Sequence, residues 1–480
     1  MSKSAISSGK KGGGCIMSTE LLSLIEPLTT RKGAGNNTND EVDIKQWYST
    51  NGKKQDYNGT FADSSKAPIH GWFKYPAGYS YKLVENKIRE YGLNHSSRIL
   101  DPFVGCGTTS VTAKEKGVNS IGIEAHSFVY WVAKVKTFWE YDMRELERAI
   151  DRTANYLQFQ NIKNKIDKVD IFEYPELVRK CYSPYNLATL KVIQDYIEHE
   201  DFNSEIKDFL KLALVDTLRT ATSAGAGWPY IAPSKYHEKT EKEAIGEFLK
   251  QVNQMHKDLK IVTKRKSPYQ VACELILGDS RKTQGIQPDS IDLAITSPPY
   301  LNNYDYADRT RLELYFCGLA NTWADITKSV RDKLMTAATT QIRRSDFNEK
   351  NPLIKDIEKT SPDVYYDLIG KIEQLGKLRL IKKGKKSYDL MVAGYFNDMF
   401  NVLKCVKTTL KEGNDFVLVL GDSAPYGVHI ATEKIIGELA LNLGYSSYET
   451  EILRVRGNKW KANPQRHHVL LKESILYITK

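Results

Sequence analysis

One segment near residue 100 restricts the possible folds of this chain more than any other. Residues 98–103 (RILDPF) form a short apolar run that predicts a buried strand, and a glycine-rich turn, 104–109 (VGCGTT), follows directly. A helical pattern then runs from Ser110 to Lys116. Strand, glycine-rich turn and helix in this order open the nucleotide-binding half of a doubly wound sheet. Because glycine permits positive φ angles and close approach of a ligand, we predict an α/β fold with a ligand at this turn.

Acidic residues after two later strands extend this pattern. The turn reads G-x-G-T-T, which differs from the dinucleotide motif G-x-G-x-x-G, and it lacks the G-K-[ST] of triphosphate loops. The next predicted strand, 120–123, ends in Glu124, where a carboxylate can accept hydrogen bonds from both hydroxyls of a ribose. A further strand, 273–277, ends in Gly278-Asp279. Both acids would therefore lie at strand ends beside the glycine-rich turn.

A second informative segment is TSPPY at 296–300, directly after the apolar run 291–295. Proline fixes φ and the residue before it is held extended, so acceptors on Ser297 and Pro298 project in fixed directions. Two convergent acceptors beside a tyrosine ring suit a flat heterocycle with an exocyclic amine. The alternative is a strand that two prolines terminate and a tyrosine that packs in the core. The glycine-rich turn and the two acids favour the first interpretation.

DPFVGCGTT at 101–109 and TSPPY at 296–300 together resemble the motifs of amino-methyltransferases from DNA restriction-modification systems. Those enzymes use S-adenosylmethionine to methylate cytosine N4 or adenine N6, and the resemblance covers most of residues 68–135 and 271–480. It implies a doubly wound, seven-stranded Rossmann-like methyltransferase sheet with a helical insertion and a possible target-recognition insertion. The cofactor half comes first along this chain, whereas many enzymes with these motifs have the TSPPY half first.

The resemblance also implies which residues would bind S-adenosylmethionine. The turn would hold the methionine half, Glu124 the ribose and Asp279 the adenine amino group. Residues 73–76 (FKYP) are similar to the segment that closes over the methionine end in this family. The implied cofactor-binding residues are Lys74, Tyr75, Asp101, Phe103, Gly105, Gly107, Thr108, Glu124 and Asp279. Cys106 lies in the same turn, where we interpret it as a small spacer and not as a nucleophile.

The implied catalytic residues are Ser297, Pro298, Pro299 and Tyr300. Acceptors from the Ser297 side chain and the Pro298 carbonyl would localise the lone pair of an aromatic amine, which then displaces the methyl group directly. Catalysis would rest on positioning and electrostatics. The base must leave the duplex, and stacking on Tyr300 would recover about 1–3 kcal/mol of that cost.

The residues are compatible with more than one target base. Relatives that methylate adenine usually carry Asp or Asn at the position of Ser297, so the serine favours cytosine N4, with adenine N6 as the alternative. An RNA guanine-N2 methyltransferase is a further alternative, although those enzymes usually have Asp before the prolines. Cytosine-C5 chemistry needs a cysteine in a Pro-Cys pair, and the chain has no such pair.

The pattern along the chain divides it into segments. Helical spacing of apolar residues at 143–166, 186–199, 204–222 and 238–262 predicts a helical insertion, with a turn and N-cap at 183–186. The predicted segments are a disordered N-terminus (1–40), the cofactor half of the methyltransferase domain (41–140), the helical insertion (141–270), the catalytic strands (271–324), a candidate target-recognition region (325–394) and the C-terminal strands (395–480). The triplet Gly421-Asp422-Ser423 is expected to be a turn after a strand.

Composition is consistent with a protein that binds DNA. The net charge is +10, which makes polyanions plausible partners, and no apolar run reaches the ~18 residues of a membrane helix. Dispersed cysteines without C-x-x-C pairs predict reduced thiols, a cytoplasmic location and no metal site. We expect double-stranded DNA as substrate and a separately encoded restriction endonuclease as a possible partner. The DNA-contact candidates are Tyr304, Arg343, Arg344, Lys382, Lys383, Arg454, Arg456 and Lys459.

Overall fold

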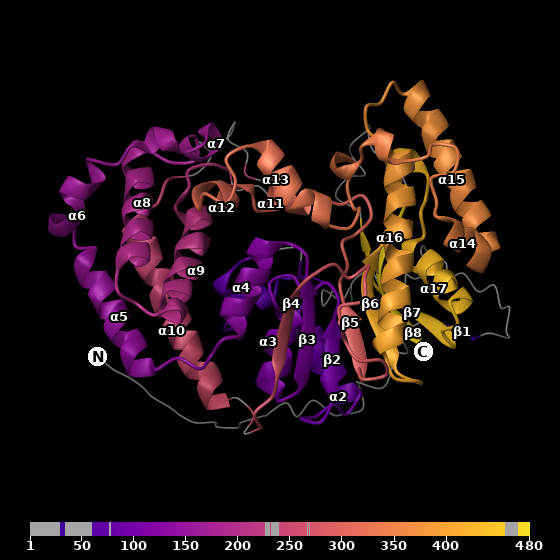
Figure 1. Ribbon diagram of the computed structural model, residues 1–480, viewed down its shortest axis with the longest axis horizontal. Helices are drawn as coiled ribbons and strands as arrows, with labels where there is room; N and C mark the ends of the chain where they lie inside the picture. The colour runs from indigo at the N-terminus through magenta and orange to yellow at the C-terminus, as the bar shows by residue number, and fades with distance from the viewer. Residues whose placement is uncertain are drawn as a thin grey trace, which may run out of the picture.

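In the computed structural model the strands form one sheet near the middle of the molecule, with helices gathered on either side (Figure 1). The structure describes residues 29–33, 60–75, 78–225, 231, 240–265, 267, 269–456 and 469–480. Within these residues the sheet has eight strands in the spatial order β1-β7-β8-β6-β5-β2-β3-β4. The strands are β1 (Thr29–Gly33), β2 (Arg98–Asp101), β3 (Asn119–Glu124), β4 (Cys273–Leu277), β5 (Leu293–Thr296), β6 (Asp415–Gly421), β7 (Ser447–Arg456) and β8 (Leu471–Thr479).

The strand order brings the ends of β2 and β5 side by side. β2 pairs in parallel with both β3 and β5, β3 pairs with β4, and β5 pairs with β6. The chain therefore grows outward from β2 to β4, and then returns to add β5 and β6 on the other side of β2. In open α/β sheets, ligands bind at such a switch point, outside the carboxyl ends of the parallel strands. The glycine-rich turn after β2 and the TSPPY segment after β5 meet at this point.

The predicted α/β doubly wound sheet is confirmed, with one strand more than the seven that we expected. β8 pairs antiparallel with both β6 and β7, and β1 adds antiparallel to the outer edge of β7, with Thr29 opposite Glu451. The prediction of a disordered segment over 1–40 is wrong for 29–33. An edge strand has unpaired backbone groups, and β1 satisfies those of β7.

The sheet is covered on both faces, because successive side chains of a strand point in opposite directions. On β5, Leu293 and Ile295 face a core that includes α2 (Tyr81–Glu90) and α3 (Thr108–Lys116), whereas Ala294 faces a core that includes α16 (Tyr388–Thr409) and α17 (Thr432–Asn442). All three side chains are completely buried. Burial on both faces explains the continuous apolar run of this strand.

The segment between β3 and β4 is helical, as its sequence pattern predicts. After α4 (Ser127–Thr137), the helices are α5 (Met143–Tyr156), α6 (Phe159–Ile166), α7 (Glu176–Arg179), α8 (Pro184–His199), α9 (Ser204–Ala221) and α10 (Ala244–Arg265). The expected N-cap of α8 is present, since the Ser183 hydroxyl accepts a hydrogen bond from the Asn186 backbone N–H at 3.3 Å.

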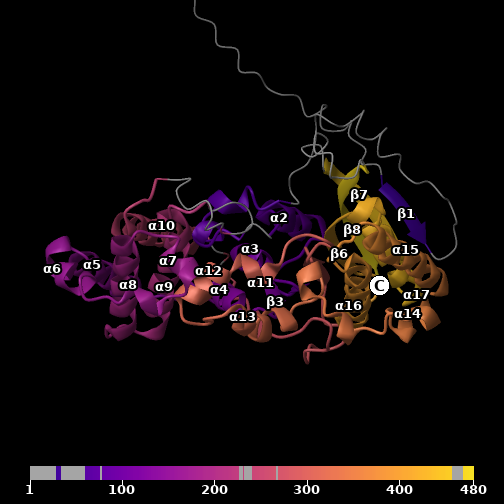
Figure 2. The same cartoon turned by 90° about the horizontal axis from the view of Figure 1, so that it is seen from above.

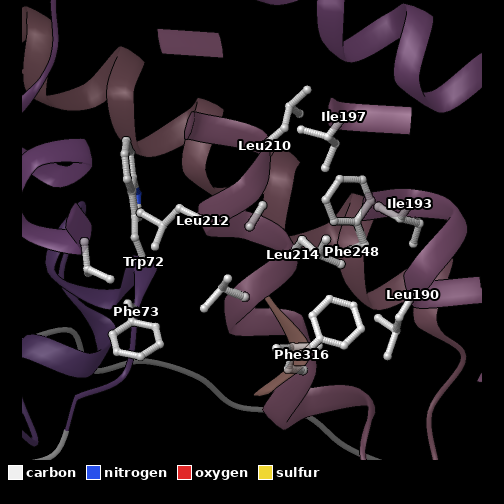
Figure 3. Close-up of a cluster of buried hydrophobic side chains, with 14 of the residues drawn as sticks. Trp72, Phe73, Leu190, Ile193, Ile197, Leu210, Leu212, Leu214, Phe248 and Phe316 are labelled. Atoms are coloured by element: carbon white, nitrogen blue, oxygen red, sulfur yellow. The ribbon is translucent and has the colours of Figure 1, made fainter. Parts of the chain in front are cut away.

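Helix α9 is the centre of the core of the insertion. Figure 3 shows Leu212 of α9 beside Trp72, while Leu214 lies toward Phe248 of α10 and toward α8. Trp72 and Phe73, which precede the first sheet strand of the cofactor half, belong to the same buried cluster as the insertion helices. The insertion is therefore packed continuously onto the cofactor half of the sheet.

The segment after β5 is helical up to β6, and it contains no strand over 325–394, all of which the structure describes. Its helices before α16 are α11 (Tyr306–Arg309), α12 (Arg311–Phe316), α13 (Trp323–Ser329), α14 (Lys355–Thr360) and α15 (Pro362–Ile381). Viewed from above, α14 and α15 lie with α17 at the opposite end of the molecule from α5 and α6 (Figure 2).

Several sequence predictions fall on residues outside those that the structure describes. They are Lys459 and the remainder of the first 40 residues. Among the helices that are described, none is both long enough and apolar enough to cross a bilayer.

Truncating Leu212 should destabilise the protein markedly. This α9 side chain has no solvent exposure, so Leu212→Ala removes buried methyl groups and leaves a cavity, which should lower the free energy of unfolding by about 2–5 kcal/mol. Urea unfolding followed by circular dichroism measures this change. Leu380→Ala on α15 is the control, because Leu380 is 69% exposed and its truncation should change stability by only about 0.5 kcal/mol or less. Equal effects of the two substitutions would contradict the placement of α9 in the core.

Candidate methyl-transfer site

A pocket of about 830 Å³, its open mouth included, lies at the switch point between β2 and β5. Its walls come from the glycine-rich turn, from the ends of β3, β4 and β5, from Tyr75, and from a strap formed by residues 333–335. The predicted site residues that line it are Tyr75, Phe103, Gly105, Thr108, Glu124, Asp279, Ser297 and Pro299. Residues more than 200 positions apart in sequence are thus brought to one cavity.

Asp101 does not line this pocket, in contrast to its expected contact with the cofactor. It is completely buried beneath the glycine-rich turn, where it accepts hydrogen bonds from the Phe103 backbone N–H at 3.0 Å and the Thr296 hydroxyl at 2.6 Å. The hydroxyls of Thr109 and Tyr79 also donate to it. Burial raises the pKa of Asp101 to about 6, against the opposing effect of these donors. Asp101 therefore ties the end of β2 to α3 and to the end of β5.

The glycine-rich turn has the backbone geometry that its sequence predicts. Gly105 has a φ of 54° and Gly107 a φ of 90°, which favour glycine. Gly107 does not line the pocket but begins α3, and a Cβ atom there would lie 3.4 Å from Ala133 of α4. The first glycine lines the pocket, and the second provides the positive φ with which the turn enters α3.

Glu124 lies at the end of β3 and is held by backbone donors. Its carboxylate accepts hydrogen bonds from the N–H of Gly105 at 3.0 Å and the N–H of His126 at 2.8 Å. Burial raises its pKa to about 7, although these two donors act in the opposite direction. The carboxylate is therefore oriented and close to its titration midpoint at neutral pH.

Asp279 lies after β4 and is clamped by Arg281. The Arg281 guanidinium donates to the two carboxylate oxygens of Asp279 at 2.8 and 3.0 Å, and also to Asp398 of α16 at 3.1 Å. Burial alone would raise the pKa of Asp279, but the hydrogen bonds from Arg281 outweigh it and the pKa lies below its ordinary value. The same guanidinium donates to the Lys333 carbonyl, so it connects Asp279 to the strap.

The two predicted residues of the closing segment behave differently. Tyr75 lines the pocket, whereas the Lys74 side chain is about half exposed and its ammonium lies 3.6 Å from Asp216 of α9. The structure thus directs Lys74 toward the insertion and away from the pocket, contrary to its expected contact with the cofactor. Buried Arg309 donates to the Lys74 carbonyl at 2.7 Å and lies over the Tyr75 ring at 5.7 Å, which holds the segment in place.

The TSPPY segment forms a ledge between this pocket and a second environment. Ser297 and Pro299 line the pocket, while Pro298 is buried and Tyr300 lies outside the lining. The Ser297 hydroxyl donates to the Val419 carbonyl of β6 at 3.5 Å, and a hydroxyl that donates one hydrogen bond can still accept others through its oxygen. Tyr300 donates its hydroxyl to Glu473 of β8 at 2.8 Å.

Three of the predicted DNA contacts, all of them arginines, form ion pairs within the protein. Arg454 pairs with Glu473, which also holds Tyr300, so Arg454 supports the ledge from β7. Arg343 pairs with Asp332 at 2.6 Å, and Arg344 pairs with both Glu349 and Asp389.

The tyrosine and lysine candidates for DNA contact differ in their exposure to solvent. Tyr304 is only 7% exposed and packs against Tyr306, so its burial disfavours the expected wedge or stacking role. Lys382 and Lys383 are exposed at the end of α15. Gly421-Asp422-Ser423 follows β6 as expected, and buried Asp422 accepts from His429 at 3.0 Å instead of lining the pocket.

Three features of the site were not predicted from the sequence. His126, Arg281 and the strap 333–335 all contribute to the pocket or to its residues. Burial lowers the pKa of His126 to about 3, so its ring is neutral, and its Nδ1 atom has no hydrogen-bond partner among the described residues. His126 and Arg281 each follow a predicted acid by two residues, and this spacing could have identified them.

The residues of the pocket fit S-adenosylmethionine. Two carboxylates at neighbouring strand ends can accept hydrogen bonds from ribose hydroxyls and from an adenine amine, and the unpartnered Nδ1 of His126 offers a further polar atom on the wall. The glycine-rich turn leaves room beside them for the amino-acid end. Among the described residues, no group of three or more His, Cys, Asp or Glu side chains could hold a metal ion.

The chain is similar in sequence to known DNA methylases. Residues 23–174 match the family described as DNA methylase, which covers the glycine-rich turn and Glu124. Over 446 residues the chain is 27% identical to the type II methyltransferase M.BsoBI of Geobacillus stearothermophilus, across 85% of this chain and 84% of that protein. It is 24% identical over 414 residues to the type II methyltransferase M.AvaI of Nostoc sp. PCC 7120, across 81% of each.

A third similarity is shorter. Over 175 residues, 35% of this chain and 32% of the other, the chain is 29% identical to the type II methyltransferase M.MjaII of Methanocaldococcus jannaschii. The two longer similarities extend over the pocket on both sides of the insertion, and the switch-point pocket is where a doubly wound sheet binds its ligand. The chain is thus similar to the DNA methylase family of amino-methyltransferases over residues 23–174, and to type II methyltransferases over more than four fifths of its length.

Proposed function

We propose that this protein transfers the methyl group of S-adenosylmethionine to the exocyclic N4 of a cytosine flipped out of duplex DNA. The single observation that carries the proposal is that Ser297 and Pro299 line the same pocket as Gly105, Glu124 and Asp279. A base amine placed on the ledge would thus be adjacent to a methyl donor held by the turn and the two acids. Proximity and orientation supply much of the rate in such a transfer.

The bound cofactor supplies an electrophilic methyl carbon on a sulfonium sulfur. The ledge prepares the nucleophile: the Ser297 oxygen and the Pro298 carbonyl accept hydrogen bonds from the two N–H bonds of the amine, so its lone pair is localised on nitrogen. As the nitrogen–carbon bond forms, the carbon–sulfur bond breaks, and the nitrogen then loses one proton to solvent. Electrostatic stabilisation by fixed acceptors matches the positive charge that develops on the nitrogen.

Ser297 supports cytosine over adenine as the target. A serine hydroxyl is a short, uncharged acceptor, whereas relatives that act on adenine usually have Asp or Asn at this position. The Ser297 hydroxyl donates a hydrogen bond to the Val419 carbonyl, so its oxygen can act as an acceptor toward the amine. Adenine N6 is the alternative target, and the product of the reaction distinguishes the two.

A role in a restriction-modification system is part of the proposal. The relatives that match over most of this chain carry the name type II methyltransferase. By analogy, methylation by this protein would protect a recognised sequence from a separately encoded endonuclease. Net charge of +10 favours association with the DNA backbone. The region 325–394, with exposed Lys382 and Lys383, remains our first candidate for contacts that select the sequence.

Methyl transfer to DNA tests the proposal directly. Duplex DNA incubated with the protein and methyl-labelled S-adenosylmethionine should yield N4-methylcytosine by mass spectrometry of the digested nucleosides. Ser297→Ala should lower kcat by about 10²- to 10³-fold, because one fixed acceptor is lost in the transition state. Ser290→Ala is the matched control, since Ser290 precedes β5 at the opposite end and only donates to the Gln287 carbonyl.

The products separate the alternatives. N6-methyladenine would show that the target base is wrong, and label in RNA but not in DNA would overturn the proposed substrate. Modification-sensitive sequencing of DNA from cells that express the protein would report the recognised sequence in the same experiment.

Cofactor affinity should rise with pH through neutrality. The pKa of Glu124 is about 7, so the carboxyl is largely protonated at pH 6 and ionised at pH 8. If the ionised form accepts the ribose hydroxyls, the Kd of S-adenosylmethionine should fall up to about tenfold per pH unit below 7 and level off above it. Isothermal titration calorimetry measures this profile. Glu124→Gln should bind more weakly and lose the slope; the wild-type slope in the Gln variant would assign it to another group, such as Asp101.

A further inference from the structure

Arg456 differs from the other predicted DNA contacts because it faces the catalytic tyrosine. It is the last residue of β7, and its guanidinium carbon lies 5.3 Å from the centroid of the Tyr300 ring. The Nη1 atom is buried and has no hydrogen-bond partner within the described part of the chain. A buried cationic donor without an acceptor is costly, so its presence next to Tyr300 indicates an absent acceptor.

The surroundings of Gly421 show which part of the Tyr300 ring the guanidinium of Arg456 approaches. A Cβ atom at Gly421 would overlap Nη1 of Arg456 and would lie 3.0 Å from Cδ2 and 3.1 Å from Cε2 of Tyr300. Nη1 is therefore beside the Cδ2–Cε2 edge of the ring. Direct stacking brings atoms to about 3.5–4.0 Å, which is shorter than the 5.3 Å from the guanidinium to the ring centre. The guanidinium lies at the margin of the face on which a base would stack.

Arg456 and Ser297 both approach strand β6 near this ring, at points two residues apart. The Ser297 hydroxyl contacts the carbonyl of Val419, and Arg456 contacts Gly421 two residues further along β6, roughly 7 Å away along the strand. This spacing leaves room for one aromatic ring with its amine at the serine. The opposite end of such a ring would face the guanidinium.

We propose that Arg456 reads the flipped target base, by donating its guanidinium hydrogen bonds to the ring N3 and the carbonyl O2 of cytosine. This inference rests on the proposed function, because it takes the base amine to be at Ser297. The Watson–Crick edge of cytosine presents the amine, N3 and O2 in this order, so an amine at Ser297 directs the two acceptors away from it. Enzymes commonly read a flipped base by hydrogen bonds to this edge.

The chemistry of the guanidinium makes this contact selective. Arginine presents a rigid fork of donors and no acceptor, which matches two adjacent acceptors. Adenine has one acceptor, N1, next to its amine and then a C–H group, so one arm of the fork would remain unpaired. A site built to pair with a substrate group rejects an analogue that lacks it. Arg456 therefore provides selectivity for cytosine that Ser297 alone does not.

Neighbouring Arg454 lacks the geometry for this role. Its guanidinium is neutralised by Glu473, which is itself bonded to Tyr300. A contact from Arg456 to a phosphate is less consistent with the burial of Nη1, because phosphates of a duplex lie at the protein surface.

A combination of protein and base variants tests the inference. Single-turnover methyl transfer is measured on a duplex carrying the recognised sequence, with either cytosine or 3-deazacytosine, which has C–H in place of N3, at the target position. For the wild-type protein the deaza base should slow transfer by about 10- to 100-fold, the usual effect of removing one partner from a charged hydrogen bond. Arg456→Met should slow transfer to cytosine by a similar factor, with little further loss on 3-deazacytosine.

Two more variants distinguish reading of the base from charge alone. Arg456→Lys keeps the charge but not the fork, so it should remain at least about 10-fold slower than wild type on cytosine. Arg89→Met removes an exposed arginine of α2 that donates to Asn86, and it should keep the full wild-type response to the deaza base. A thermal melt monitored by circular dichroism confirms that each variant is folded.

The outcomes separate this inference from the function on which it rests. Multiplicative losses in Arg456→Met on 3-deazacytosine would overturn the contact with N3. Full activity of Arg456→Lys, or a weaker Kd for DNA with an unchanged transfer rate and a smaller salt dependence in Arg456→Met, would assign Arg456 to a phosphate and overturn the inference. Transfer by the wild-type protein to adenine would overturn both proposals, whereas transfer to cytosine without coupling to Arg456 would overturn only this one.

Discussion

The arrangement of the site depends on the hydrogen bonds around the buried carboxylate of Asp101. An isolated buried carboxylate is expensive, and four donors from three different parts of the chain offset this cost here. One of them is the hydroxyl of Thr296, the residue directly before Ser297. Because the turn and the ledge share this acceptor, the position of the pocket wall that would hold the cofactor is coupled to the position of the ledge. Parallel pairing of β2 with β5 brings the two together, and Asp101 fixes their ends.

A second set of buried charges holds the closing segment over the pocket. Glu313 of α12 has no solvent exposure and pairs with Arg219 of α9 at 2.5 Å and with Arg309 at 3.4 Å. Arg309 in turn holds the carbonyl of Lys74 and lies over the ring of Tyr75. Asp216 of α9 also pairs with Lys74. The helical insertion thus holds the segment that contributes Tyr75 to the pocket. Breaking a buried network of this kind is strongly destabilising. The network therefore holds the insertion rigidly against the segment that follows β5.

Much of the fold could be predicted because its strands and helices have clear local patterns of apolar residues. The strands after residues 98, 119, 273 and 415 were evident from short apolar runs, and the insertion helices from three- and four-residue spacing. Residues of the pocket lining could be predicted where they lie at or just after the end of a strand, because the strand end fixes their position. Gly105, Glu124, Asp279 and Ser297 are examples. The motif alone could not show that Asp101 points under the turn, since this depends on the hydroxyls of Thr109 and Thr296, which donate to its carboxylate. Likewise Lys74 is drawn to Asp216, which is 142 residues away in sequence. The strap at 333–335 and the strand β1 are placed only by tertiary contacts.

The central claim is that one pocket presents a methyl donor to the ledge, and a structure of the protein with sinefungin bound tests it most directly. Sinefungin carries an amine where S-adenosylmethionine carries its transferable methyl group. We predict that this amine lies within about 6 Å of the Ser297 oxygen, which leaves space for one nucleophilic nitrogen at near-attack distance from the donor and in hydrogen-bond contact with the serine. The adenosine should lie toward Glu124 and Asp279. An analogue that binds elsewhere, or whose amine points away from the ledge, would contradict the account.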